Sequence, residues 1–165
     1  MELLLISGSL RAGSTNETML RTVAHVAPVD DDREPLPTPV AELRSAIAAA
    51  DALMFCTPEY AGTLPGSFKN LLDWTVGGIE TTDKPSAWIN AANPGRGSGA
   101  SETLRMVLKY TGAAVVEEAC VSIPVDKGAV IDGVITDPEA RKQVAASLAT
   151  LIAAAVNAES IMITV

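Results

Sequence analysis

The apolar positions of this chain form short continuous runs that alternate with longer stretches of helical periodicity. Continuous apolar runs are typical of strands buried on both faces, and their alternation with helices favours a parallel sheet covered on both sides. The pattern predicts strands at residues 2–7, 52–57, 86–92 and 114–123, and helices at residues 15–25, 38–50, 66–76, 98–110 and 137–155. The sequence therefore predicts an α/β protein with a doubly wound parallel sheet.

One strand of the expected sheet has no counterpart in this pattern. A five-stranded doubly wound sheet commonly has the order 2-1-3-4-5, and the second strand belongs between the first two predicted helices. Residues 26–37 lie there, and they are rich in proline and contain the run Asp30-Asp31-Asp32. Either the second strand is short, missing or replaced, or the linker crosses directly between the two faces, since about a dozen extended residues span roughly 40 Å. The second arrangement leaves the first strand as an exposed edge.

The length and composition of the chain indicate a single domain. The chain has 165 residues, of which 48% are apolar. A chain of this size buries roughly two thirds of its unfolded surface in one core. We expect one domain at residues 1–157 and a tail at residues 158–165, whose apolar end, Ser160–Val165, pairs as a strand along a sheet edge or against a neighbouring subunit. The alternative is that this end packs on its own domain.

The charge and the cysteines narrow the class of protein. The net charge is −8 without a basic stripe, so we expect no binding to nucleic acid. No apolar run approaches the roughly 18 residues of a membrane span, and the first residues are predicted to form a strand rather than a signal peptide, so no membrane association is expected. Cys56 and Cys120 fall in predicted strands and are interpreted as reduced core residues, in keeping with a cytoplasmic protein. No pair of residues has the spacing of metal ligands.

The first strand-to-helix loop, residues 8–16, has the chemistry of an anion site. The N–H groups at the start of a helix and the helix dipole favour a bound phosphate. Ser9, Ser14 and Thr15 add hydroxyl donors, and Arg11 adds a cation that can hold a phosphate through two bonds. The alternative is an ordinary turn in which a serine caps the helix.

The second and third loops follow the strands at residues 52–57 and 86–92. In the second, Tyr60 offers a flat apolar face with a polar tip, and Gly62 allows close approach of the backbone to a ligand. The third loop contains three glycines between residues 95 and 99, together with Arg96. The alternatives are a surface aromatic and a flexible turn, but loops after neighbouring parallel strands converge on one crevice.

These motifs together resemble the NADPH-dependent FMN reductase family, which includes quinone reductases, chromate reductases and azoreductases. The resemblance covers about residues 1–125 and rests on Gly8-Ser9-Leu10-Arg11, Gly13-Ser14, Asn16, Pro58-Glu59-Tyr60, Pro65-Gly66, Lys69-Asn70 and Asp73-Trp74. It implies a flavodoxin-like fold in which the first loop binds the FMN phosphate and the other two line the isoalloxazine ring. The residues implicated are Ser9, Arg11, Ser14, Thr15, Asn16, Pro58, Glu59, Tyr60, Ala61, Gly62, Asn93, Gly95, Arg96 and Gly97. Ala61 stands where the family often has Asn, which removes a side-chain hydrogen bond.

The resemblance also implies an activity in which FMN carries the chemistry. NADPH, or NADH, would reduce bound FMN, which would pass two electrons by a ping-pong route to a small acceptor: a quinone, free flavin, an azo compound or a metal oxyanion. No catalytic side chain is expected, and Glu59 is interpreted as a residue that structures its loop. A homodimer or homotetramer is implied. The alternatives are a flavodoxin-type electron carrier or a flavin-binding sensor, and a flavin-free interaction scaffold.

Overall fold

The computed structural model describes residues 1–7, 35–131 and 134–162. The described chain forms β1 (Leu3–Ser7), α2 (Thr38–Ala49), β2 (Ala52–Cys56), α3 (Gly66–Asp73), β3 (Pro85–Asn90), α4 (Ser98–Tyr110), β4 (Ala114–Val115), the 3-10 helix η1 (Glu117–Ala119), β5 (Val121–Ser122), the 3-10 helix η2 (Lys127–Ala129), β6 (Val130–Ile131), β7 (Val134–Ile135) and α5 (Pro138–Met162). Each strand and helix predicted within these ranges has a counterpart, whereas the helix predicted at residues 15–25 lies outside them.

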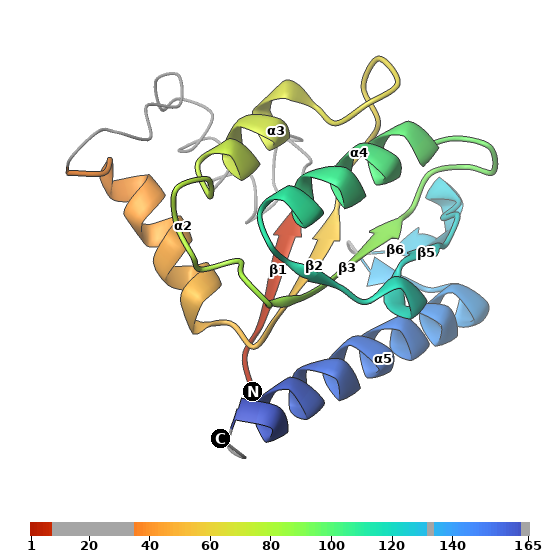
Figure 1. The fold of residues 1–165 in the computed structure, drawn as a ribbon. Helices are drawn as coiled ribbons and strands as arrows, with labels where there is room; N and C mark the ends of the chain where they lie inside the picture. The colour runs from red at the N-terminus through yellow and green to blue at the C-terminus, as the bar shows by residue number, and fades with distance from the viewer. Residues whose placement is uncertain (8–34, 132–133, 163–165) are drawn as a thin grey trace.

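The central sheet is parallel and has the order β1-β2-β3-β4, with β5 also paired to β3. Figure 1 shows the strands pointing the same way, with α3 and α4 toward their carboxyl ends and α5 running below. This order matches the predicted order 2-1-3-4-5 from its first strand onward. The fold is α/β and flavodoxin-like in architecture. The predicted place of the second strand falls mainly on residues outside the described ranges.

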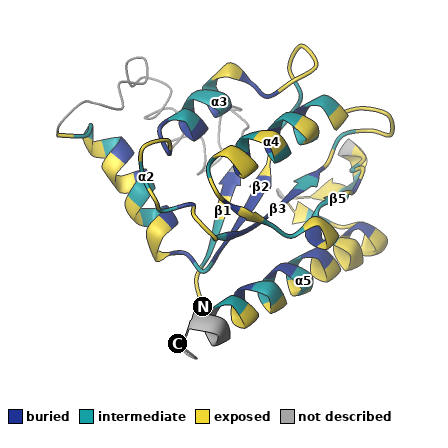
Figure 2. Ribbon diagram, in the orientation of Figure 1, coloured by how far each residue is buried: buried dark blue, intermediate teal, exposed yellow. Residues whose placement is uncertain are grey.

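The two faces of the sheet are buried against different helices because strand side chains alternate between faces. Leu53 and Phe55 of β2 belong to the core formed with α2, α3 and α4, where Phe55 meets Phe68 edge-to-face at 6.3 Å. Met54 belongs to the core on the other face, which includes Leu151 of α5. Figure 2 shows the buried strands between these layers and the exposed outer side of α5. The prediction of strands buried on both faces is confirmed for β2.

The free edge of β1 is exposed within the described part of the chain. β1 pairs with β2 alone there, and 60% of Leu5 is accessible to solvent. An exposed edge at β1 was predicted for the arrangement in which the linker crosses directly between the two faces, and that arrangement stays a prediction.

The strand predicted at residues 114–123 is interrupted. Ser86 pairs with Val115 and Ile89 pairs with Val121, so β3 advances three residues while the edge chain advances six. The three additional residues form η1, and the Ala119 carbonyl accepts a hydrogen bond of 2.6 Å from the Ser147 hydroxyl of α5. The insertion acts as a large bulge that moves the polar residues of η1 out of the sheet.

The C-terminal segment differs from the expectation. α5 continues to Met162, so the interpretation of Ser160–Val165 as a strand is wrong for its described part. A short apolar run at the end of a helix has the local composition of a strand, and continuation of the helical hydrogen bonds decides otherwise. The division into a domain at residues 1–157 and a tail stays a prediction. Among the described helices, none is long and apolar enough to cross a membrane.

Candidate functional site

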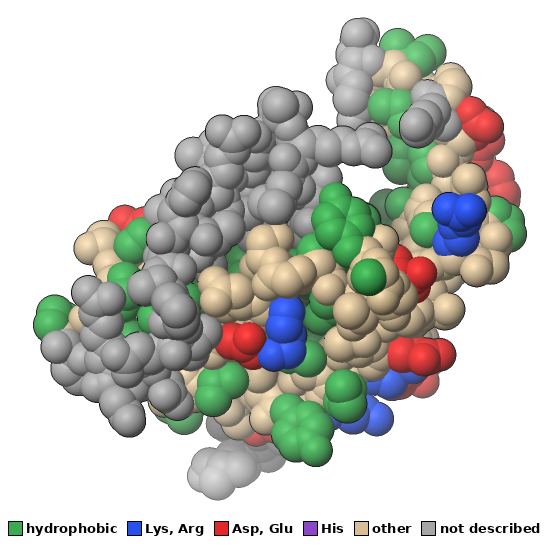
Figure 3. Space-filling model, turned by 90° about the horizontal axis from the view of Figure 1, so that it is seen from above, with side chains coloured by type: hydrophobic (Ala, Val, Ile, Leu, Met, Phe, Trp, Pro, Cys, Tyr) green, Lys and Arg blue, Asp and Glu red, His purple; other side chains and the backbone are tan. Residues whose placement is uncertain are grey.

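The second and third predicted loops lie together at the carboxyl edge of the sheet. They follow β2 and β3, which are adjacent parallel strands. Figure 3 views this edge from above and shows isolated basic side chains near acidic ones. The first predicted loop lies outside the described residues, and with it Ser9, Arg11, Ser14, Thr15 and Asn16. The structure therefore brings together two of the three predicted loops.

A tight turn presents the backbone of the second loop. The N–H of Tyr60 donates to the Thr63 carbonyl at 2.9 Å, and the N–H of Thr63 donates to the Tyr60 carbonyl at 3.1 Å. Ala61 and Gly62 both have positive φ, at 50° and 79°, as a type I′ turn requires. Asn is favoured over Ala in this conformation. The backbone conformation at position 61 therefore favours Asn, the residue that the family often has there, over the Ala of this chain.

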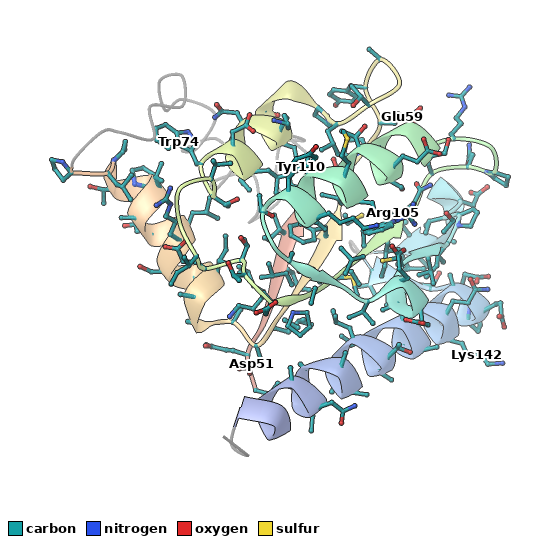
Figure 4. The ribbon with its side chains drawn as sticks, in the orientation of Figure 1. Asp51, Glu59, Trp74, Arg105, Tyr110 and Lys142 are labelled. Atoms are coloured by element: carbon teal, nitrogen blue, oxygen red, sulfur yellow. The ribbon has the colours of Figure 1, made fainter. Side chains whose placement is uncertain are left out.

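Glu59 fastens this loop to α4. Its Oε2 accepts hydrogen bonds from the backbone N–H groups of Gly99, at 2.8 Å, and Ala100, at 3.3 Å. Both N–H groups belong to the first turn of α4, where they have no helical acceptor and the dipole favours a negative charge. Figure 4 shows Glu59 beside the beginning of α4. This geometry agrees with the interpretation of Glu59 as a residue that structures the loop.

Two further contacts bring the loop close to α4. A Cβ on Gly99 would overlap the carbonyl oxygen of Gly62, so glycine at position 99 permits this approach. The hydroxyls of Thr63 and Thr103 lie 2.9 Å apart and share a hydrogen bond. Gly99 and Thr103 were not among the predicted site residues. The clustered glycines before and within the start of α4 were the only sequence signal for Gly99.

The third loop is organised by Asn90 at the end of β3. The side-chain amide of Asn90 donates to the Arg96 carbonyl at 3.0 Å, and its Oδ1 accepts from the Ala92 N–H at 3.0 Å. Gly97 has a φ of 83°, and a Cβ there would overlap the Asn90 side chain. Asn90 is buried and was missed by the sequence prediction. A polar residue ending an otherwise apolar strand was the signal that could have identified it.

The predicted residues of the third loop lie mostly on its surface. Asn93, Gly95 and Arg96 are exposed, whereas Gly97 is buried. The Arg96 N–H donates to the Asn93 carbonyl at 3.1 Å, and Gly95 has a φ of 78°, which together close a turn that begins with Asn93-Pro94. This is the conformation in which Pro and Gly occupy the two central positions of a type II turn.

The described loops suit a flat ligand. Tyr60 is 56% exposed, so its ring is accessible to a planar partner. A Cβ built on Gly62 or on Gly95 would meet no atom within 4 Å, so open space lies beside both backbones. The N–H groups and carbonyls of such turns can bind the polar edge of a heterocycle. On these observations, the residues present fit a flavin ring between the two loops.

The two cysteines differ from the prediction. Both are free thiols, but Cys56 is exposed and Cys120 is half-buried, so the interpretation of both as core residues is wrong for Cys56. Cys56 ends β2, where the sheet gives way to the second loop. Burial is the main cause that raises the pKa of Cys120 to about 11, and the neighbouring Glu117 and Glu118 add to it.

The fold, with these two loops at the carboxyl edge of its parallel sheet, is that of a flavodoxin-like protein. A flavoenzyme, the NAD(P)H:(acceptor) oxidoreductase FerB from Paracoccus denitrificans, matches with a TM-score of 0.72 and 26% identity over 91% of this chain and 94% of that chain. Flavodoxin 1 from Bacillus cereus matches with a TM-score of 0.54 and 19% identity over 92% of this chain and 97% of that one, which shows the fold alone.

Residues 28–128 match the model of the NADPH-dependent FMN reductase family, and the chain belongs to this family of oxidoreductases. A NAD(P)H-dependent FMN reductase of Pseudomonas aeruginosa is 35% identical over 56% of this chain and 60% of its own length. A 2-hydroxy-1,4-benzoquinone reductase of a Burkholderia species is 27% identical over 86% of this chain and 89% of its own length. The predicted resemblance is therefore confirmed.

Proposed function

We propose that this protein is an FMN-dependent NAD(P)H oxidoreductase that reduces a small quinone. Family membership supports the general activity, and the similarity to a benzoquinone reductase over 89% of that relative's length supports quinones among the possible acceptors. The structural observation that carries the proposal is the pair of loops at the carboxyl edge, where Tyr60 is exposed beside open space at Gly62 and Gly95.

The predicted residues divide into two groups in this proposal. Ser9, Arg11, Ser14, Thr15 and Asn16 would hold the phosphate of FMN. The loop of Pro58, Glu59, Tyr60, Ala61 and Gly62 and the loop of Asn93, Gly95, Arg96 and Gly97 would line its ring. Bound FMN would supply two-electron chemistry between NADPH, or NADH, and the acceptor in a ping-pong sequence.

The protein's own contribution is to position these loops. Glu59 fixes the second loop on α4, and Asn90 fixes the third loop through the Arg96 carbonyl. Both hydrogen bonds are part-buried and hold the loops in place before a ligand binds. Pre-organised donors increase affinity because less conformational entropy is lost on binding.

We also propose the cellular setting that composition and family resemblance imply. The protein would act as a homodimer or homotetramer in the cytoplasm, with small molecules as its substrates and without nucleic acid or membrane partners. Size-exclusion chromatography with light scattering would measure the assembly. A monomer at micromolar concentration would contradict this part of the proposal.

The decisive experiment is anaerobic absorbance spectroscopy of protein loaded with FMN. Addition of NADPH or NADH should bleach the flavin band within seconds, and addition of a benzoquinone should restore it. Comparison of the two nucleotides at equal concentration would identify the preferred donor. Bound flavin that stays oxidised would favour the carrier or sensor alternative, and a protein that binds no FMN would contradict the proposal.

A further inference from the structure

A polar cavity lies between α4 and the sheet edge at β5. It has a volume of about 350 Å³, and its lining includes Arg96, Ser98, Ser101, Arg105 and Ser122. It shares Gly95 and Arg96 with the third loop but includes no residue of the second. Its volume is at the lower end of the range for small-molecule sites.

Arg105 is held rigidly on this cavity. Its guanidinium carbon lies 4.9 Å from the centre of the Trp88 ring, as in a cation–π contact. Its Nε donates to both carboxylate oxygens of Glu117, at 3.0 and 3.1 Å. Figure 4 shows Arg105 below α4, on the side of β5. These two contacts favour one orientation of the guanidinium before any ligand arrives.

The two terminal nitrogens of Arg105 remain as donors. Within the described residues, its hydrogen bonds come from Nε alone. A guanidinium carries five N–H groups, and its planar fork matches a carboxylate or phosphate through two parallel bonds. The ion pair with Glu117 therefore orients this fork and leaves its terminal donors available to a ligand.

The charged groups around the cavity nearly balance, so an anion there would be held by hydrogen-bond donors rather than by excess positive charge. Arg96 adds a second guanidinium, and no ion pair of its own is recorded within the described residues. Glu102 is the carboxylate in the lining, and Glu117 faces Arg105 from η1. The two guanidinium groups and the two carboxylates around the cavity therefore carry equal and opposite charge, although the whole chain has a net charge of −8. The hydroxyls of Ser98, Ser101 and Ser122 add neutral groups that can donate to oxygen.

We propose that this cavity binds a small molecule through a carboxylate or phosphate group, with Arg105 as the main ligand and Arg96 as the second. The cavity shares Gly95 and Arg96 with the loop proposed to line the flavin ring, whereas Arg105, its main ligand, lies outside that loop. The edge insertion at η1 creates it, because η1 supplies Glu117 at the position where that carboxylate holds Arg105.

The test uses the two tryptophans of the chain as reporters. Trp88 lines the cavity, whereas Trp74 is buried elsewhere and is absent from the lining. In ¹H–¹⁵N NMR spectra of the full chain, titration with inorganic phosphate and, separately, with benzoate should shift the indole signal of Trp88 and the Nε–H signal of Arg105 in a saturable manner. The Trp74 signal should move little. The tighter probe would distinguish a phosphate ligand from a carboxylate.

Variants make the test specific. Arg105→Gln should weaken binding of the tighter probe by about tenfold or more, because a charge-assisted bidentate pair is lost. Lys109→Gln removes the same charge one turn further along α4 and should leave the affinity within about twofold, since Lys109 is exposed and outside the cavity. An affinity for the tighter probe that is unchanged in Arg105→Gln, or equal losses in both variants, would overturn the proposal, as would the absence of saturable Trp88 shifts with both probes.

Discussion

The carboxylate of Glu59 accepts a hydrogen bond of 2.8 Å from the backbone N–H of Gly99, forty residues further along the chain. Through this bond the loop after β2 and the first turn of α4 form one unit. Gly99 also allows the loop and the helix to approach closely, because a side chain there would overlap the Gly62 carbonyl. The spatial relationship of the two loops that border the proposed flavin site therefore depends on α4.

Glu59→Ala should destabilise the protein and weaken FMN binding. Two N–H groups of α4 lose their acceptor, and loss of an N-terminal cap costs about 0.5–2 kcal/mol. Thermal unfolding and a fluorescence titration with FMN would measure the two effects. Glu42→Ala removes an exposed carboxylate from α2 and serves as the control, with little change expected. Equal unfolding temperatures for the Glu59 variant and the wild type would contradict the anchoring role.

Gly99→Ala should displace the second loop. The added Cβ would meet the Gly62 backbone, and such overpacking typically costs about 1–3 kcal/mol. Gly66→Ala is a matched control, because a Cβ there meets nothing within 4 Å and Ala favours helix. We expect urea denaturation to show a loss for the first variant and none for the second. If both variants unfold at the wild-type midpoint, the close approach at position 99 is not significant.

Ala61→Asn should stabilise the turn at residues 60–63. Ala61 has a φ of 50°, a conformation that Asn tolerates better than Ala, and relief of this cost should raise the free energy of unfolding by a few tenths to about 1 kcal/mol. Ala61→Gly should act in the same direction. Urea denaturation measures both variants, and a loss of stability in each would show that the turn differs from the one described.

The two cysteines should differ in reactivity toward a thiol reagent. Only a thiolate reacts, and burial raises the pKa of both thiols, that of Cys120 to about 11. The expected difference therefore rests on access, because the Cys56 side chain is exposed and that of Cys120 is half-buried. Folded protein at pH 8 should release one equivalent quickly, and Cys56→Ser should abolish that phase. A fast phase that survives in Cys56→Ser would contradict this assignment.

The raised pKa of Cys120 also predicts a pH dependence of stability. Its folded pKa of about 11 lies above the unperturbed value of 9.0, so the folded state favours the protonated thiol. This contribution is fully present below pH 9 and is lost as the pH rises toward 11. Between pH 8 and pH 10.5 the unfolding free energy of the wild type should therefore fall relative to that of Cys120→Ala. A difference that is constant over this range would contradict the shift.

The sequence predicted α4 within its observed bounds because a small-residue turn, an apolar periodicity and Gly112 all indicate the same limits. It could not predict η1, because Glu117 and Glu118 interrupt an apolar run in a way that is also compatible with an exposed strand face. The contact of Gly99 with Gly62 could not be predicted either. It depends on how closely a helix and a loop from distant parts of the chain approach, which no local pattern records.

Site residues whose roles depend on local sequence could be predicted, whereas those whose roles depend on tertiary contacts could not. Tyr60, Gly62 and Gly95 were identifiable as loop residues from composition and from the strands before them. Asn90 was not, because its role appears only when the third loop folds back over the strand end. At the C-terminus the local apolar pattern led to a helix ending near residue 155 and a strand after it, and this is wrong because α5 continues to Met162.

The interruption at η1 has a consequence for how molecules of this protein meet each other at high concentration. A long regular outer strand offers a row of unpaired backbone groups onto which a strand from another molecule can add. Here β4 and β5 are two residues each and are separated by a helical turn that carries two carboxylates. This side of the sheet is therefore a poor template for the growth of intermolecular β-structure, and deletion of the three inserted residues should make the protein more prone to form fibrils.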